Sequence, residues 1–231
     1  MSVTRPDTQD VTVTVDHAHR VSGLLHRPER AAACYVLAHG AGAGMRSPFL
    51  EAIATGLGKA RIATLRFQFP YMEQGLKRPD SPKLAHAAVR AAIAEACRLV
   101  PQLPLIAGGR SFGGRMTSQA QAVSPLPQVR GLAFLGFPLH PSGNPSDERG
   151  THLVDVRIPM LFLQGTRDAL ADLELIEQLV NRLGNLGTLK LVEHADHGFH
   201  VPARSGREDS EVRRELIEAL AGWIDKIIAR S

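Results

Sequence analysis

The stretch LPLIAGGRSFGG, residues 103–114, decides the fold. Its first part, LPLIAGG (103–109), is apolar up to the glycines, which is typical of a strand buried on both faces, and a helical segment follows. Between them Gly109-Arg110-Ser111-Phe112-Gly113 matches G-x-S-x-G, a sharp strand-to-helix turn that strains the serine and lifts its hydroxyl above the sheet edge. The pattern predicts that Ser111 is a nucleophile. The alternative is a tight turn in which Ser111 only caps the helix.

Strands alternate with helices on both sides of this turn. Strands are expected at 11–15, 21–26, 34–40, 61–67, 103–109, 131–137, 159–165 and 189–193, and helices near 47–60, 83–100, from 111, 170–183 and 208–230. The first two strands alternate polar and apolar residues, as antiparallel strands do. The rest predicts right-handed βαβ units, hence an α/β fold with a mostly parallel central sheet and helices on both faces. With no linker or repeat, residues 1–231 are expected to form a single domain.

Composition narrows the classes of partner and compartment. The net charge is +4, but no long basic run is present, so a nucleic-acid partner is not expected. Two cysteines, Cys34 and Cys97, favour a reducing cytoplasm over a disulfide framework. The polar N-terminus MSVTRPDTQD has no apolar signal region, and no stretch reaches the roughly 18 apolar residues of a membrane helix. A cytoplasmic protein without membrane contact is therefore predicted.

Candidate partners for Ser111 follow two later strands. A serine nucleophile needs a base, and the base needs an orienting carboxylate. Asp168 comes after the strand at 159–165, and His197 comes after the strand at 189–193, which gives the order Ser, Asp, His. The competing interpretations are an N-cap for Asp168 and a surface-loop histidine for His197. His194 and His200 flank His197, but their spacing fits no usual zinc pattern, so neither a metal nor another cofactor is expected.

The glycine-rich loop after the third strand, His39-Gly40-Ala41-Gly42-Ala43-Gly44, is expected to border the nucleophile. Acyl transfer requires two N–H donors for the oxyanion, and we assign them to the amides of Phe112 and Ala41. His39 is expected to shape this loop by hydrogen bonding. The loop also permits a dinucleotide-binding interpretation, but its glycines do not follow the G-x-G-x-x-G spacing.

Several residues near these loops are candidates for contact with a substrate. We assign substrate binding to His39, Gly40, Arg110, Tyr71 and Met72. An apolar wall is predicted from Phe67, Phe69, Tyr71 and Met72, with core packing as the alternative for the two phenylalanines. Arg110 and Arg115 are expected to form salt bridges with nearby carboxylates rather than to bind an acidic substrate. The short, proline-interrupted segment 138–158 leaves no room for a long helical cap, so the lid is predicted to be minimal or absent.

These motifs together resemble the α/β-hydrolase superfamily, in particular its dienelactone-hydrolase-like members. The matching stretches are HGAGAG (39–44), GGRSFGG (108–114), GTRD (165–168) and HADHGF (194–199). RFQFPYMEQG (66–75) is similar to a stretch of a group of predicted hydrolases that includes testis-expressed proteins and a subunit of a histone acetyltransferase complex. The resemblance implies the α/β-hydrolase fold and the triad Ser111, Asp168 and His197. Dienelactone hydrolases carry a cysteine nucleophile, so their lactone specificity is not implied for Ser111.

The residues and the resemblance predict a serine hydrolase that cleaves small or medium carboxylic esters or thioesters through an acyl-enzyme on Ser111. Its partner is a small-molecule ester, and no cofactor is required. Two alternatives stay open. One is a short-peptide or amide hydrolase with the same machinery, and the other is a non-catalytic binding or scaffolding protein, in which the triad would not assemble. The oligomeric state and the natural substrate are not predicted.

Overall fold

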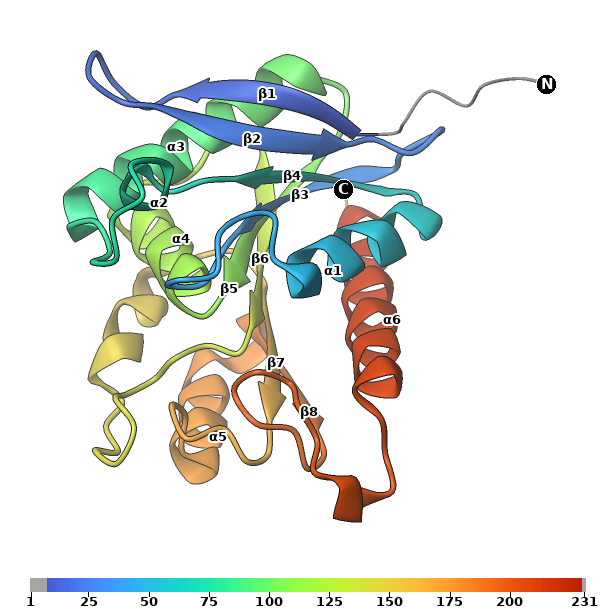
Figure 1. Ribbon diagram of the computed structural model, residues 1–231. Coiled ribbons are helices and arrows are strands. Elements are labelled where there is room, and N and C mark those ends of the chain that lie inside the picture. The colour runs from blue at the N-terminus through green and yellow to red at the C-terminus, as the bar shows by residue number, and fades with distance from the viewer. Residues whose placement is uncertain (1–7, 230–231) are drawn as a thin grey trace.

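One eight-stranded sheet forms the centre of the protein, as Figure 1 shows. The computed structural model describes residues 8–229. The strands are β1 (Thr8–Thr14), β2 (Arg20–His26), β3 (Ala33–Ala38), β4 (Ile62–Phe67), β5 (Leu105–Arg110), β6 (Val129–Leu135), β7 (Met160–Gly165) and β8 (Gly187–Val192). Their spatial order is β1-β2-β4-β3-β5-β6-β7-β8. β2 pairs antiparallel with β1 and β4, whereas β3 to β8 run parallel.

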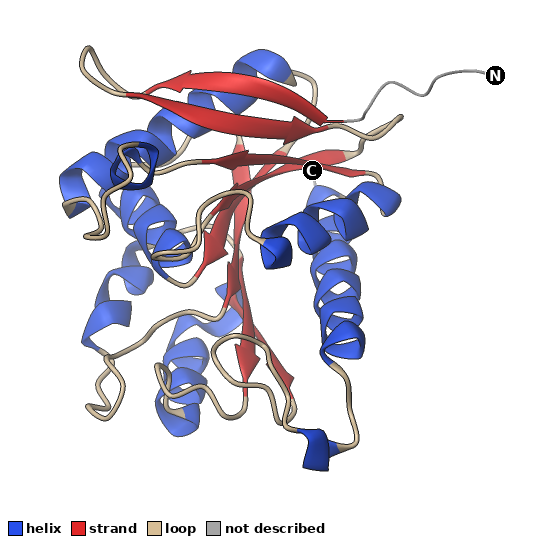
Figure 2. Cartoon of the chain, viewed as in Figure 1, coloured by secondary structure: helices blue, strands red, loops and turns tan. Residues whose placement is uncertain are grey.

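Helices cover both faces of the sheet, and Figure 2 shows this layering. α1 (Pro48–Lys59) packs beside α6 (Asp209–Ile228) on one face, and α3 (Pro82–Leu99) packs beside α4 (Phe112–Val123) on the other. α5 (Leu173–Leu183) contributes its apolar side to the same core as α3 and α4. The shorter elements are α2 (Pro70–Glu73) and three 3₁₀ segments, η1 (Glu148–Asp155), η2 (Gly184–Leu186) and η3 (Ala203–Ser205).

The two faces of the sheet bury separate apolar cores. Side chains alternate along a strand, so Ile106 packs toward α1 and α6 while Ala107 packs toward α3 and α4. β3, β4 and β7 are buried along their whole length. This agrees with their near-continuous apolar sequences, because a parallel sheet covered on both faces leaves no polar side.

The predicted order of elements is confirmed, and the fold class is the expected one. Each predicted strand and helix is present within a few residues of its expected bounds. Residue 230, the end of the predicted last helix, lies outside the described residues. Four short elements, α2, η1, η2 and η3, were not predicted from the sequence. In the part of the chain that the structure describes, no helix has the length and apolar character needed to cross a bilayer.

The topology brings the loops after four parallel strands to one edge of the sheet. β5, β7 and β8 are parallel, so the loops that follow them emerge at their common carboxyl edge. The loop after β3 emerges at this edge as well. The candidate residues after these four strands therefore lie within reach of one another.

Candidate active site

The turn between β5 and α4 holds Ser111 in a strained conformation. Ser111 has φ 49° and ψ −117°, a combination that L-residues rarely adopt. The neighbouring backbone fixes the turn by close approach: a Cβ at Gly109 would lie 2.3 Å from the carbonyl oxygen of Ala38, and one at Gly113 would lie 2.5 Å from that of His39. Glycine is therefore required on both sides of the serine, because the turn is pressed against the end of β3.

Ser111 occupies the N-cap position of α4 without acting as its cap. Its side chain makes no capping hydrogen bond. Instead its Oγ lies 2.9 Å from Nε2 of His197. The alternative in which Ser111 serves only as an N-cap is therefore wrong.

Asp168 lies just after β7 with its side chain fully buried. One carboxylate oxygen, Oδ2, is 2.7 Å from Nδ1 of His197 and also accepts a hydrogen bond from the Gln164 amide at 2.5 Å. The other oxygen accepts the backbone N–H of Leu170 at 2.8 Å. The N-cap of α5 is Asp172, so the N-cap interpretation of Asp168 is also wrong.

The loop after β8 presents His197 between these two groups. Its side chain is 24% exposed, and Gly136 at the end of β6 packs beside the ring. Asp196 fixes the loop, because its Oδ1 accepts the backbone N–H groups of Gly198 and His200. Since an ionised carboxylate only accepts hydrogen bonds, Nδ1 of His197 donates to Asp168. Nε2 is then free to accept the proton of the Ser111 hydroxyl.

The buried side chains of His39 and Tyr71 form hydrogen bonds with the glycine-rich loop. His39 is fully buried; its Nε2 accepts the Phe69 backbone N–H at 3.0 Å, and its Nδ1 donates to the Gly40 carbonyl at 2.8 Å. Burial lowers the pKa of His39 to about 4, although the bond to Gly40 opposes this shift. The Tyr71 hydroxyl accepts the Gly42 N–H at 3.1 Å. Both side chains therefore hold the loop in place.

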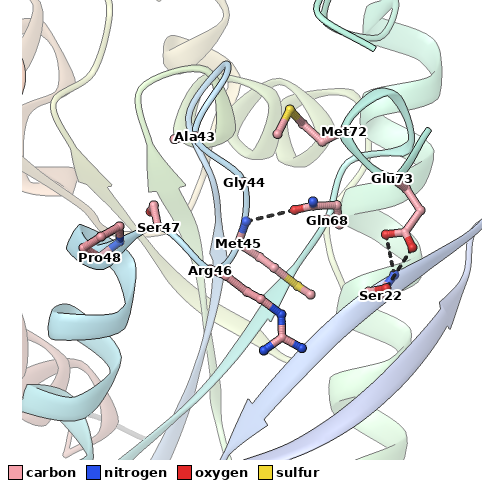
Figure 3. Close-up of a pocket in the computed structure, with 10 residues that line it drawn as sticks. All are labelled: Ser22, Ala43, Gly44, Met45, Arg46, Ser47, Pro48, Gln68, Met72 and Glu73. Atoms are coloured by element: carbon pink, nitrogen blue, oxygen red, sulfur yellow. Dashed lines mark hydrogen bonds between the residues drawn. The ribbon is translucent and has the colours of Figure 1, made fainter. Parts of the chain in front are cut away.

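The expected contacts of these residues with a substrate do not hold for Tyr71, Phe67 and Phe69. All three side chains are at most 1% exposed and belong to the core, so they form no wall of an open cleft. His39 is equally buried, which leaves it the loop-shaping role. Met72 is half-buried beside Gly44. It borders a cavity of about 540 Å³ that also touches Gln68 and Glu73, and Figure 3 shows how these side chains surround it.

Two backbone N–H groups next to Ser111 carry no partner. Within residues 8–229, neither the amide of Ala41 nor that of Phe112 donates a hydrogen bond to the protein. Phe112 is the first residue of α4, where no intrahelical acceptor exists. The loop before Ala41 lies against the nucleophile, since a Cβ at Gly40 would be 3.6 Å from Cβ of Ser111.

Arg110 and Arg115 form none of the expected salt bridges. In the described part of the chain, neither guanidinium pairs with a carboxylate. Arg110 lies over the Phe49 ring, 4.5 Å from its centroid. Burial lowers the pKa of both arginines; the Asp196 charge opposes this for Arg110, and the Arg149 charge adds to it for Arg115.

With this geometry known, comparison with known proteins identifies the family. The sequence-family model that describes an alpha/beta hydrolase domain matches residues 31–225 of the chain. The protein belongs to the α/β-hydrolase family. The α/β-hydrolase fold is shared by solved structures of low sequence identity, which support the fold alone.

Three of these structures illustrate the likeness. A dienelactone hydrolase from Anabaena variabilis has a TM-score of 0.76 at 22% identity, covering 96% of this chain and 99% of its own. An α/β serine hydrolase homologue from Coxiella burnetii has a TM-score of 0.74 at 19% identity, covering 92% and 97%. A protein from Xanthomonas campestris, described as an α/β serine hydrolase without a lid, has a TM-score of 0.72 at 19% identity, covering 96% and 98%. The predicted lack of a lid agrees with this last neighbour.

Gln164 is the site residue that the sequence analysis missed. It is fully buried on β7; its amide donates to Asp168, and its Oε1 accepts the Phe137 backbone N–H at 2.9 Å. A glutamine inside the apolar run PMLFLQG was the available signal, because a buried amide needs partners for both its donor and its acceptor.

Proposed function

We propose that this α/β hydrolase cleaves small or medium carboxylic esters or thioesters through an acyl-enzyme on Ser111. The observation that carries the proposal is the hydrogen-bonded chain from Ser111 Oγ through His197 to Asp168, with distances of 2.9 and 2.7 Å. A nucleophile, a base and an orienting carboxylate in this contact are the requirements for activating a hydroxyl near neutral pH.

The reaction follows from the roles that the geometry permits. Nε2 of His197 takes the hydroxyl proton while Ser111 Oγ attacks the carbonyl carbon, and Asp168 stabilises the charged imidazole. The free amides of Ala41 and Phe112 donate to the oxyanion. Collapse of the tetrahedral intermediate breaks the bond to the leaving group, which receives the proton from His197. Water then attacks the acyl-enzyme, gives its proton to His197, and releases the acid and the serine hydroxyl.

The scaffolding alternative has less support. It requires a triad that fails to assemble or a nucleophile blocked by side chains. Here Ser111 and His197 are partly exposed, and both hydrogen bonds of the proposed triad are formed.

Labelling with a fluorophosphonate probe tests the proposal directly. The native protein should be labelled, and Ser111→Ala and His197→Ala should not. Ser124→Ala, at an exposed serine beyond the other end of α4, should label like the native chain. Turnover of 4-nitrophenyl esters should fall on the order of 10⁶-fold in Ser111→Ala. Absence of labelling in folded native protein would contradict the proposal and return the scaffolding alternative.

A further inference from the structure

Arg115 is a charged side chain beside the nucleophile without a counter-charge. It lies one helical turn after Ser111, whose carbonyl accepts its backbone N–H at 3.1 Å. Helical side chains lean toward the N-terminus, so the Arg115 side chain covers the turn that carries Ser111. Its Nε is buried and, among residues 8–229, has no hydrogen-bond partner. The partly buried guanidinium forms no ion pair within residues 8–229, and an uncompensated charge of this kind is costly, so an anion that reached its terminal NH₂ groups from outside would compensate it.

The groups around Arg115 add positive charge or none. Arg149 on η1 is close enough for its charge to lower the pKa of Arg115. His152 on η1 is held neutral, because burial and then the Arg115 charge lower its pKa to about 4. Burial also lowers the pKa of His86 on α3. Within residues 8–229 neither Arg115 nor Arg149 forms an ion pair, although Asp155 lies near enough to act weakly on His152.

Arg115 and Arg149 lie on a different side of Ser111 from the groups that face the leaving group. The proton for the leaving group comes from His197, and the arginine next to the His197 loop is Arg110, whose guanidinium lies near Gly198. The groups around Arg115 come instead from α3 and η1, which both pack against α4; Oγ of Ser118 on α4 lies 2.8 Å from Nε2 of His152 on η1. A ligand at Arg115 therefore lies away from the loop whose histidine protonates the leaving group.

We propose that Arg115, together with Arg149, binds a carboxylate at the far end of the acyl chain, so that the preferred substrates are half-esters or half-thioesters of short dicarboxylic acids. The inference rests on the proposed function and names its substrate class. A guanidinium presents paired N–H donors that match a carboxylate. Side chains one helical turn apart start about 6 Å from each other, which suits a diacid of about four to six carbons.

The test compares charged and neutral esters of equal length. Mono-4-nitrophenyl succinate, glutarate and adipate are measured against 4-nitrophenyl butyrate, pentanoate and hexanoate, with Ser111→Ala giving the spontaneous rate. For at least one length, kcat/KM of the half-ester should exceed that of its neutral partner by roughly tenfold to a hundredfold. Arg115→Gln should bring this ratio close to one. Arg130→Gln, which removes the same charge from an exposed position at the amino end of β6, should keep the native ratio.

A second measurement does not depend on catalysis. Free glutarate should raise the melting temperature of the native protein and of Arg130→Gln, but not that of Arg115→Gln, and neutral glutaramide should raise none. Equal turnover of charged and neutral esters without stabilisation by glutarate would overturn the anion site and leave the proposed function standing. If neither ester is hydrolysed, the proposed function fails. The melting data then decide the site alone: a rise lost in Arg115→Gln supports it, and no rise overturns it.

Discussion

Acidification should destabilise this hydrolase through His39, and the size of the effect follows from its burial. His39 is fully buried at the end of β3, where Nε2 must stay unprotonated to accept the Phe69 N–H. Its pKa is lowered from 6.5 to about 4, chiefly by burial. Because the folded-state pKa is the lower one, the unfolded chain binds a proton first as the pH falls. The stability contributed by neutral His39 is complete above pH 6.5 and is lost progressively down to about pH 4.

The magnitude follows from the width of that window. A difference of one pKa unit corresponds to about 1.4 kcal/mol, so the full loss below pH 4 is on the order of 3 kcal/mol. Between pH 7 and pH 5 the linkage relation gives about 2 kcal/mol of lost unfolding free energy. This is a large part of the stability of an ordinary domain, about 5–15 kcal/mol.

Urea denaturation at pH 7 and pH 5 measures this contribution. His39→Gln removes the titration, so its loss between the two pH values should be smaller than the native loss by about 2 kcal/mol. Some loss should remain, because the pKa of His152 is also lowered to about 4. His17→Gln, at an exposed position, should keep the native difference. If His39→Gln loses as much stability as the native chain, the buried neutral histidine is not the cause and the reasoning is refuted.

Three further substitutions test the supports of the site. Gln164→Leu removes the donor to buried Asp168, so kcat/KM for a 4-nitrophenyl ester should fall about tenfold to a hundredfold; unchanged kinetics would contradict a positioning role. Tyr71→Phe frees the Gly42 N–H, so fluorophosphonate labelling should slow several-fold while the melting temperature falls only about 2–4 °C. Gly109→Ala places a methyl group 2.3 Å from a β3 carbonyl oxygen, so cooperative melting should be lost; a native-like melt would show that the turn can relax.

The sequence predicted those features that depend on residues close together in the chain, namely the strands and the residues that follow them. Ser111, Asp168 and His197 each follow a predicted strand by at most five residues, and the apolar signal is strong for β5 and β7 and weaker for β8. Their positions therefore depended only on strand order and parallel pairing. Gln164 was missed because its role depends on Asp168 and on a strand neighbour, both of which meet it only in the folded sheet. The salt bridges expected for Arg110 and Arg115 were wrong for a related reason. The sequence shows that carboxylates are present, but not which side chains the fold turns toward them.

The residues proposed for catalysis and those proposed for substrate selectivity differ in the same way. Ser111, Asp168 and His197 stand on turns held by backbone contacts at strand ends, and small changes there would disturb the triad. The residues proposed to choose the substrate, Arg115 and Arg149, lie on α4 and on η1. η1 is an eight-residue segment too short to close over the cleft. Without enclosure, a small ester gains little binding energy from buried apolar area, so a fixed charge is the most effective means of discrimination left. On this proposal the minimal lid and the two arginines, which form no ion pair within residues 8–229, are parts of one arrangement, in which an open site would select its substrate by charge.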